Sequence, residues 1–165
     1  MNGTPGFAEF VAARSPALLR TAYLLTGDWA AGEDLLQATL EQCWRRWSRL
    51  TGNPEAYVRQ AMLRTFLSWR RRRWTGEVPT LELPDVRVDD ATSAVDDRDQ
   101  VWPALLRLPR RQRAVVVLRY FDDLSEAETA HALGISVGTV KSQASKALAS
   151  LRVDAALADR VDEVI

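Results

Sequence analysis

Residues 124–151 read LSEAETAHALGISVGTVKSQASKALASL, and this stretch decides the fold of the C-terminal half. Ser125 and Glu128 form a capping box, in which a hydroxyl and a carboxylate satisfy the exposed amide groups at the start of a helix. The apolar side of this short helix is thin and consists of Ala127, Ala130 and Leu133. Gly134 permits a tight turn, and Ser136 can cap the next helix. A short helix, a glycine turn and a capped longer helix predict a helix-turn-helix.

The second helix of this motif has two different faces when its residues are placed at about 100° each. The apolar face consists of Val137, Val140, Ala144, Ala147, Leu148 and Leu151. Small residues on the other face let a helix sit deep in the major groove, while hydroxyls, amides and lysines bond to bases or phosphates. An ordinary solvated helix would more often carry Glu and Arg pairs, so we predict DNA recognition. The recognition face has Gly138 at its start, and its predicted DNA contacts are Thr139, Lys141, Ser142, Gln143, Ser145 and Lys146.

The N-terminal half has the pattern of three helices joined by short turns. Apolar residues recur at helical spacing over residues 7–26, and Gly27 offers a stop. Asp28 can cap a second helix, which we expect to end near residues 51–54. Pro54 suits the start of a third helix, which continues into a run of four arginines. Together the three helices predict a compact bundle.

Charge is sorted along the chain, although the 22 basic and 22 acidic residues cancel. The first basic run consists of Arg70, Arg71, Arg72 and Arg73. The charged residues over 77–99 are mainly acidic, and basicity then returns at Arg107, Arg110, Arg111, Arg113 and Arg119. Two basic zones separated by an acidic spacer indicate two nucleic-acid contacts on one chain.

The helical periodicity fails between about residues 75 and 97, where Pro79 and Pro84 lie among acidic and small residues. Such a composition is typical of a flexible tether, which leaves the domains on either side free to move. Beyond it we expect helices on both sides of Pro109, and we assign Val115 to Val117 to a helix because their flanks are helical. The prediction is an all-α protein with two small domains: residues 1–75, a flexible acidic linker over 76–96, residues 97–153, and a tail over 154–165.

Aromatic residues accompany the first basic run. Trp69 and Trp74 lie beside the arginines, and aromatic rings next to arginines can stack on unpaired bases while the arginines neutralise the backbone. Stacking contributes roughly 1 to 3 kcal/mol per base, which is comparable with the cost of unstacking a step. The arginines could instead form a solvated helix end, and Phe66 is more typical of a core residue.

Several motifs resemble the extracytoplasmic-function sigma factors of the sigma-70 family, in particular the SigE-like subgroup. The sequences LPRRQRAV at 108–115, LRYF at 118–121, LSEAE at 124–128 and GTVKS at 138–142 are similar to that family's fourth conserved region. GEDLLQ at 32–37 and NPEAYVR at 53–59 are similar to its second region. The resemblance covers nearly the whole chain except the linker and tail.

This resemblance implies a sigma factor that binds core RNA polymerase and directs it to promoter DNA, where it opens the strands and starts transcription. The matching polymerase-binding positions, against the clamp helices of the largest subunit, are Asp34, Gln37 and Trp44. The turn over 48–54 and the helix after it would read the opened −10 element through Asn53, Arg64, Trp69 and Arg70 to Arg73. The C-terminal helix-turn-helix would read the −35 element. Whether an anti-sigma factor also binds stays open.

The chain departs from the family pattern at a few positions. Ala38 stands where Glu is usual, and Arg64 stands where Asn is usual. Gln143 and Lys146 occupy positions where arginine is common. These departures bear on one polymerase contact and leave the preferred base sequences of both promoter elements open.

Other features favour a cytoplasmic protein without a membrane segment, cofactor or metal. The N-terminus lacks a basic segment followed by an apolar run, so we expect no signal peptide, and no stretch approaches the ~20 apolar residues of a membrane span. Cys43 is the single cysteine, which excludes an internal disulfide and is typical of a small buried residue.

Three other classes of protein compete with the sigma factor. An ordinary DNA-binding regulator would not need the polymerase-binding surface on the second helix. A sigma mimic usually carries a receiver domain, for which this chain has no room. An enzyme is the weakest alternative, because His131 is the only histidine and has no metal-ligating neighbour in sequence.

Overall fold

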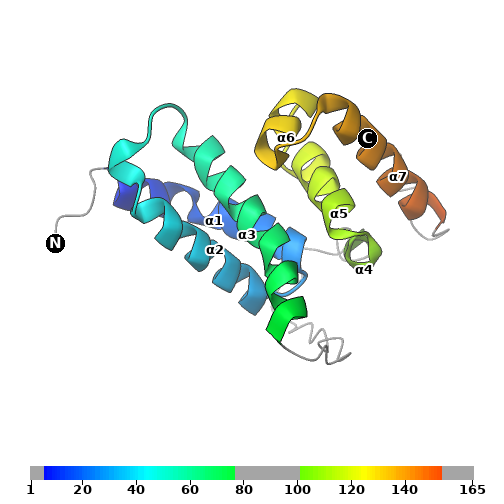
Figure 1. The fold of residues 1–165 in the computed structure, drawn as a ribbon, viewed down its shortest axis with the longest axis horizontal. Coiled ribbons are helices and arrows are strands. Elements are labelled where there is room, and N and C mark those ends of the chain that lie inside the picture. Colours follow the sequence, from blue (N-terminus) through cyan, green and yellow to red (C-terminus); the bar gives the residue numbers. More distant parts are fainter. Residues whose placement is uncertain (1–5, 77–100, 154–165) are drawn as a thin grey trace.

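The computed structural model describes residues 6–76 and 101–153, without the side chains of residues 70–76, 101 and 102. The described part is helical throughout (Figure 1). The N-terminal half consists of α1 (Phe7–Thr26), α2 (Trp29–Trp44), the short 3-10 helix η1 (Trp47–Arg49) and α3 (Pro54–Gly76). The C-terminal half consists of α4 (Val101–Arg107), α5 (Arg110–Val116), the π-helical turn η2 (Val117–Phe121), α6 (Glu126–Leu133) and α7 (Val137–Val153). The predicted linker and tail lie outside the described residues, apart from Gly76.

Local chemistry sets the ends of the first helices as predicted. Gly27 ends α1 in the left-handed conformation, with a φ of 83°, and donates its N–H to Tyr23. Asp28 caps α2 by accepting a hydrogen bond from the N–H of Ala31 at 3.2 Å. The predictions of Gly27 as a helix stop and of Asp28 as a helix cap are both confirmed. Each depends only on hydrogen bonds to backbone groups a few residues away.

The second helix ends earlier than the sequence predicts, at Trp44 instead of near residues 51–54. The reason is Trp47, which the 3-10 turn directs inward. Its ring lies 5.0 Å from the ring of Phe7 and 5.1 Å from that of Phe10, measured between centroids. Burial of this indole against two aromatic rings outweighs one more turn of α-helix.

A conventional apolar core fills the N-terminal bundle. Its largest fully buried side chains include Leu25, Leu35, Met62, Leu63 and Phe66. Phe66 is 1% exposed, which confirms it as a core residue. Cys43 is fully buried beside them, and burial raises the pKa of its thiol to about 11.

The C-terminal half is built around α5 and η2, where Val115, Val116 and Val117 are helical and buried. The assignment of this valine run to a helix is therefore confirmed. The helix-turn-helix follows as predicted: the Ser125–Glu128 capping box is complete, and Gly134 has a φ of 66°. Ser136 accepts a hydrogen bond from the N–H of Thr139 at 3.1 Å at the start of α7.

The two halves are packed against each other in the described residues, an arrangement that the sequence left open. Ala114, Val117, Leu118 and Ala132 of the C-terminal half belong to the same apolar cluster as the core of α1 to α3. Figure 1 shows α5 and α6 beside the N-terminal bundle and α7 on the side away from it. The apolar surface that joins the halves comes from segments far apart in sequence. No local sequence pattern therefore predicts it.

Candidate polymerase and nucleic-acid interfaces

The recognition face of α7 is exposed. Five of the six predicted contacts are exposed, namely Thr139, Lys141, Ser142, Ser145 and Lys146, whereas Gln143 is half-buried. On the opposite face Val140, Ala144, Ala147 and Leu151 are buried, and Leu148 is partly buried. Val137 departs from the predicted apolar face, because it lies in the first turn and is 39% exposed.

Two contacts position the start of the recognition helix. The hydroxyls of Ser136 and Thr139 are 2.8 Å apart, which orients Thr139 at the first turn. The ammonium of Lys141 lies 3.6 Å from the carboxylate of Glu126 in α6. Ala127 is exposed, and the buried residues of α6 are Thr129, Ala130 and Ala132, so the predicted apolar side of α6 is partly wrong. The reason is that α6 contacts both α7 and the N-terminal bundle.

A shallow apolar groove of about 510 Å³ runs along α1 and α2. Its lining consists of Phe7, Leu19, Glu33, Leu36, Gln37, Leu40, Glu41, Trp44 and Arg45. Gln37 is exposed, and Trp44 is 39% exposed with its ring edge against Phe7 at 5.0 Å. Asp34 is exposed one turn before Gln37 and is not part of the lining. The structure therefore places two of the three predicted polymerase-binding residues in one groove and the third beside it.

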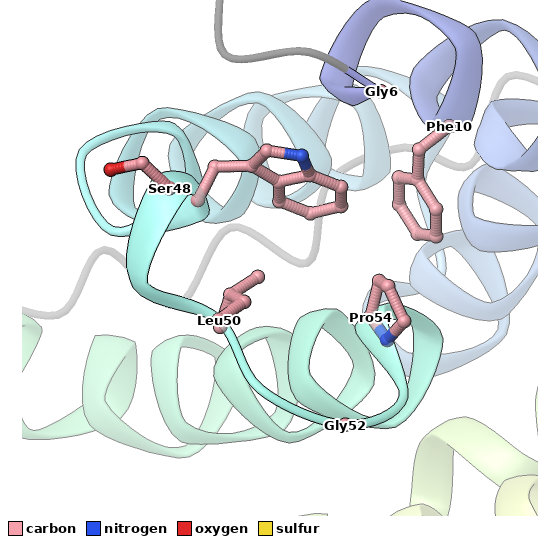
Figure 2. A pocket seen from close by; sticks show the side chains of 7 residues that line it. Gly6, Phe10, Ser48, Leu50, Gly52 and Pro54 are labelled. Carbon is pink, nitrogen blue, oxygen red and sulfur yellow. The ribbon is translucent and has the colours of Figure 1, made fainter.

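A second hollow, of about 650 Å³, lies where α2 turns into α3. Its lining consists of Gly6, Phe10, Trp47, Ser48, Leu50, Gly52 and Pro54. Figure 2 shows Phe10, Leu50 and Pro54 pointing toward a common space, whereas the hydroxyl of Ser48 points away from it. The turn over 48–54 thus forms one wall of an aromatic and apolar hollow. Asn53 is exposed, and its side chain accepts a hydrogen bond from the N–H of Glu55 at 3.0 Å.

Sequence reasoning missed Phe10 and Trp47 as lining residues. The two aromatic rings come from α1 and η1, and no spacing in the sequence joins them. The glycine and proline of the turn were the only local signal for this site.

The remaining residues predicted for the −10 element are placed differently. Arg64 is exposed on α3, whereas Trp69 is half-buried and packs against the core cluster. The side chains of Arg70, Arg71, Arg72 and Arg73 lie outside the described residues, although α3 extends through them. Of the predicted −10 residues on α3 whose side chains the structure describes, only Arg64 is thus exposed.

Two arginines of the second basic zone, Arg113 and Arg119, bond to backbone carbonyl groups. Arg113 is 8% exposed and donates hydrogen bonds to four carbonyl oxygens, those of Leu25, Leu105, Leu106 and Leu108. Burial and then the charge of Arg110 lower the pKa of Arg113 to about 10, so it stays protonated near neutral pH. Arg119 donates to the carbonyl of Leu124. These arginines hold helix ends together, and the prediction of a basic DNA contact is wrong for Arg113.

Asp122, which directly follows η2, has a side chain that is 6% exposed and lies outside all three surfaces. Its carboxylate accepts a hydrogen bond from the hydroxyl of Thr21 at 2.9 Å and lies 3.7 Å from the guanidinium of Arg59. Burial raises the pKa of this carboxyl, and the hydroxyl of Thr21 and the charge of Arg59 oppose that rise. Desolvation is thus the larger effect.

The described residues were also compared with the requirements of a metal site and of a membrane-spanning helix. No group of three histidine, cysteine or acidic side chains that could hold a metal ion occurs among them. None of their helices has both the length and the apolar composition that a membrane crossing needs. Cys43 is buried, and His131 is an exposed residue of α6.

Comparisons with known proteins match both halves of the chain. Residues 10–75 match the model of sigma-70 region 2, and residues 98–151 match that of sigma-70 region 4. The RNA polymerase sigma-E factor of Streptomyces avermitilis is 45% identical over 148 residues, which span 88% of this chain and 83% of that protein. The ECF RNA polymerase sigma factor SigL of Mycobacterium tuberculosis is 33% identical over 143 residues, 82% of this chain and 81% of that protein.

A solved structure resembles both halves together. The sigma factor RpoE of Bartonella quintana, in complex with the anti-sigma factor NepR, has a TM-score of 0.77 at 25% identity. The match covers 90% of this chain and 96% of that chain.

The fold, the exposed recognition helix and these matches define a sigma factor, and the chain belongs to the sigma-70 family of RNA polymerase sigma factors. Within the family it is of the extracytoplasmic-function, SigE-like type. Its function is to direct RNA polymerase in transcription initiation.

Proposed function

We propose that three separate surfaces of this sigma factor divide the work of initiation. The groove on α1 and α2, with Gln37, Trp44 and the adjacent Asp34, binds core polymerase. The turn over 48–54 and α3 hold the opened −10 element, and α7 reads the −35 element. The exposed polar row on α7 carries this proposal, because small hydroxyl and lysine side chains stand opposite a buried apolar face.

The hollow between α1, η1 and the turn supports the assignment of the −10 site. Phe10 and Trp47 supply aromatic surface, and its volume is in the range of small-ligand pockets. An unstacked base could enter it and recover part of the lost stacking energy, which is roughly 1 to 3 kcal/mol per base. We therefore assign this hollow to one base of the opened strand.

These surfaces divide the chain into two binding units. Residues 1–75 form the unit for polymerase and −10 binding, and residues 97–153 form the unit for −35 binding. We assign no reaction to this protein, since core polymerase supplies the chemistry, and we place it in the cytoplasm with that enzyme. The complex of RpoE with NepR supports an anti-sigma factor as a further partner.

The test of this function is promoter opening with and without core polymerase. We expect the protein together with core to yield run-off transcripts from the promoter upstream of its own gene. Permanganate should then modify unpaired thymines in the −10 region. The protein alone should bind the same duplex weakly and leave its thymines unreactive, because each surface offers few contacts. Tight sequence-specific binding that core polymerase does not change would contradict the proposal and favour an ordinary regulator.

Lys146→Ala and Ser142→Ala should weaken −35 recognition without unfolding the domain. Both residues are exposed on the face of α7 opposite its buried side chains. Each lost base or phosphate contact should cost about 1 to 3 kcal/mol of binding, or about 5-fold to 150-fold. Fluorescence anisotropy with a −35 duplex measures this loss, and thermal melting should show an unchanged Tm.

Ser150→Ala provides the matched control, because Ser150 is also exposed but lies near the far end of α7. It should leave DNA binding unchanged. A large fall in Tm for Ser142→Ala or Lys146→Ala, with normal DNA affinity per folded molecule, would show that the assigned face of α7 is wrong.

A further inference from the structure

The two lysines on the recognition face of α7 differ in their surroundings. The ammonium of Lys141 lies 3.6 Å from the carboxylate of Glu126, in the first turn of α6, whereas Lys146 has no ion pair with any residue that the structure describes. The side chain of Lys141 nevertheless keeps 65% of its surface exposed. An ammonium has several N–H donors, so Lys141 can contact Glu126 and DNA at the same time.

The carboxylate beside Lys141 projects from a fixed stretch of backbone. The capping box closes around Glu126: the N–H of Glu128 donates to the hydroxyl of Ser125 at 3.1 Å, and the N–H of Ser125 donates to the carboxylate of Glu128 at 2.7 Å. The side chain of Glu126 is 38% exposed, so it is more enclosed than that of Lys141. The fold of α6 thus sets the direction from which Glu126 reaches Lys141.

Glu126 opposes DNA binding in a way that does not depend on sequence. In a helix-turn-helix the second helix lies in the major groove, while the first helix crosses the sugar–phosphate backbone. If α7 reads the −35 element, Glu126 belongs to the helix that crosses the phosphates. Its negative charge repels them and offsets part of the positive charge that Lys141 presents. Glu126 therefore weakens binding to every duplex.

The same ion pair gives an advantage that does depend on sequence. A lysine without a partner has many rotamers, and its ammonium can follow a phosphate in almost any register of the protein on DNA. Ordering such a side chain on binding costs free energy, and a contact within the protein removes part of that cost beforehand. For Lys141 this gain arises only in the register that brings DNA to its held ammonium. The pair should therefore favour one DNA sequence over others.

We propose that Glu126 determines the sequence specificity of −35 recognition by holding Lys141, and that it lowers the affinity for DNA in general. Glu126 is thus a positioning residue, and Lys141 makes the DNA contact. Glu128 has a different role, because its carboxylate closes the capping box. The inference rests on the proposed function, in which α7 reads the −35 element.

Glu126→Gln in the full-length protein tests this role, because glutamine keeps the length of the side chain and removes its charge. Fluorescence anisotropy gives the Kd for a −35 duplex and for a scrambled duplex of the same composition, and the ratio of the two Kd values measures specificity. Both duplexes should bind more tightly, since a repulsive charge is lost. The ratio of scrambled to −35 Kd should fall about fivefold, which corresponds to about 1 kcal/mol. The Tm should stay near that of the wild type, as for most surface substitutions.

A double-mutant cycle shows whether Glu126 acts through Lys141. In a Lys141→Met background, Glu126→Gln should leave the ratio unchanged, because no ammonium remains to be held. In a Lys146→Met background it should still lower the ratio about fivefold, since Lys146 takes no part in the pair.

Asp123→Asn is the matched control for the loss of a negative charge. Asp123 is exposed and lies three residues before Glu126, and asparagine tolerates its positive φ of 53°. This variant has the same net charge as Glu126→Gln but keeps the ion pair. It should therefore leave the ratio of the two Kd values unchanged.

The outcomes separate this inference from the proposed function. A clear preference of the wild type for the −35 duplex that Glu126→Gln does not reduce would overturn the role of Glu126 and leave the assignment of α7 in place. An equal fall in the ratio with and without Lys141 would also overturn that role. A wild-type protein that binds both duplexes equally would contradict the assignment of α7 to the −35 element, and the inference would fail with it.

Discussion

Replacing Arg113 with methionine is expected to lower the free energy of unfolding by about 3–5 kcal/mol. The guanidinium satisfies carbonyl groups at the ends of two helices, α1 and α4, and methionine has no donor for them. Of the carbonyls it contacts, that of Leu105 keeps a hydrogen bond from the N–H of Leu108 at 3.1 Å. The carbonyls of Leu25, Leu106 and Leu108 lose the bond that Arg113 donates. Urea unfolding followed by circular dichroism measures the loss.

Arg111→Met is the matched control, because Arg111 lies on the same helix and is exposed. Its stability should stay within about 0.5 kcal/mol of the wild type, as for most surface substitutions. Equal stability of the two variants would contradict this prediction. It would show that the hydrogen bonds of Arg113 stabilise the fold no more than the burial of its charge destabilises it.

Replacing Asp34 and Trp44 together with alanine is expected to abolish promoter opening by the protein with core polymerase. A partly exposed tryptophan in an apolar groove has the character of a binding hot spot, whose truncation typically costs at least about 2 kcal/mol. With Asp34 also removed, we expect core binding to weaken by roughly 100-fold. Run-off transcription and permanganate reactivity at the −10 region should both be lost, while affinity for a −35 duplex should not change.

Trp29→Ala controls for the loss of an exposed tryptophan. Trp29 is 52% exposed and stacks on Tyr23 with ring centroids 4.0 Å apart, outside the groove on α1 and α2. It should transcribe like the wild type. Normal transcription by the Asp34 and Trp44 double variant would place the polymerase contact elsewhere on the chain.

Features that depend on close neighbours in sequence could be predicted from the sequence. Asp28 as a helix cap and the Ser125–Glu128 capping box both act on amide groups three residues away. The end of α2 could not be predicted in this way, because it depends on where Trp47 finds an apolar environment. The docking of the halves could not be predicted either, since Thr21 and Asp122 are 101 residues apart.

The site shows the same division. Helical spacing alone separates the exposed and buried faces of α7, because each residue's direction follows from its number. The charge pattern could not predict the position of Arg113. A basic residue in a basic zone looks the same in sequence whether it faces DNA or bonds to a helix end. The aromatic hollow required tertiary structure, since Phe10 and Trp47 meet only when α1 and η1 are packed together.

The burial of Cys43 limits how this protein can respond to oxidants. Oxidation and disulfide exchange proceed through the thiolate, and a thiol with a pKa of about 11 that is sealed in the bundle offers almost none at neutral pH. The sequence contains no second cysteine with which it could pair. In the folded protein Cys43 is thus poorly placed to act as a redox sensor.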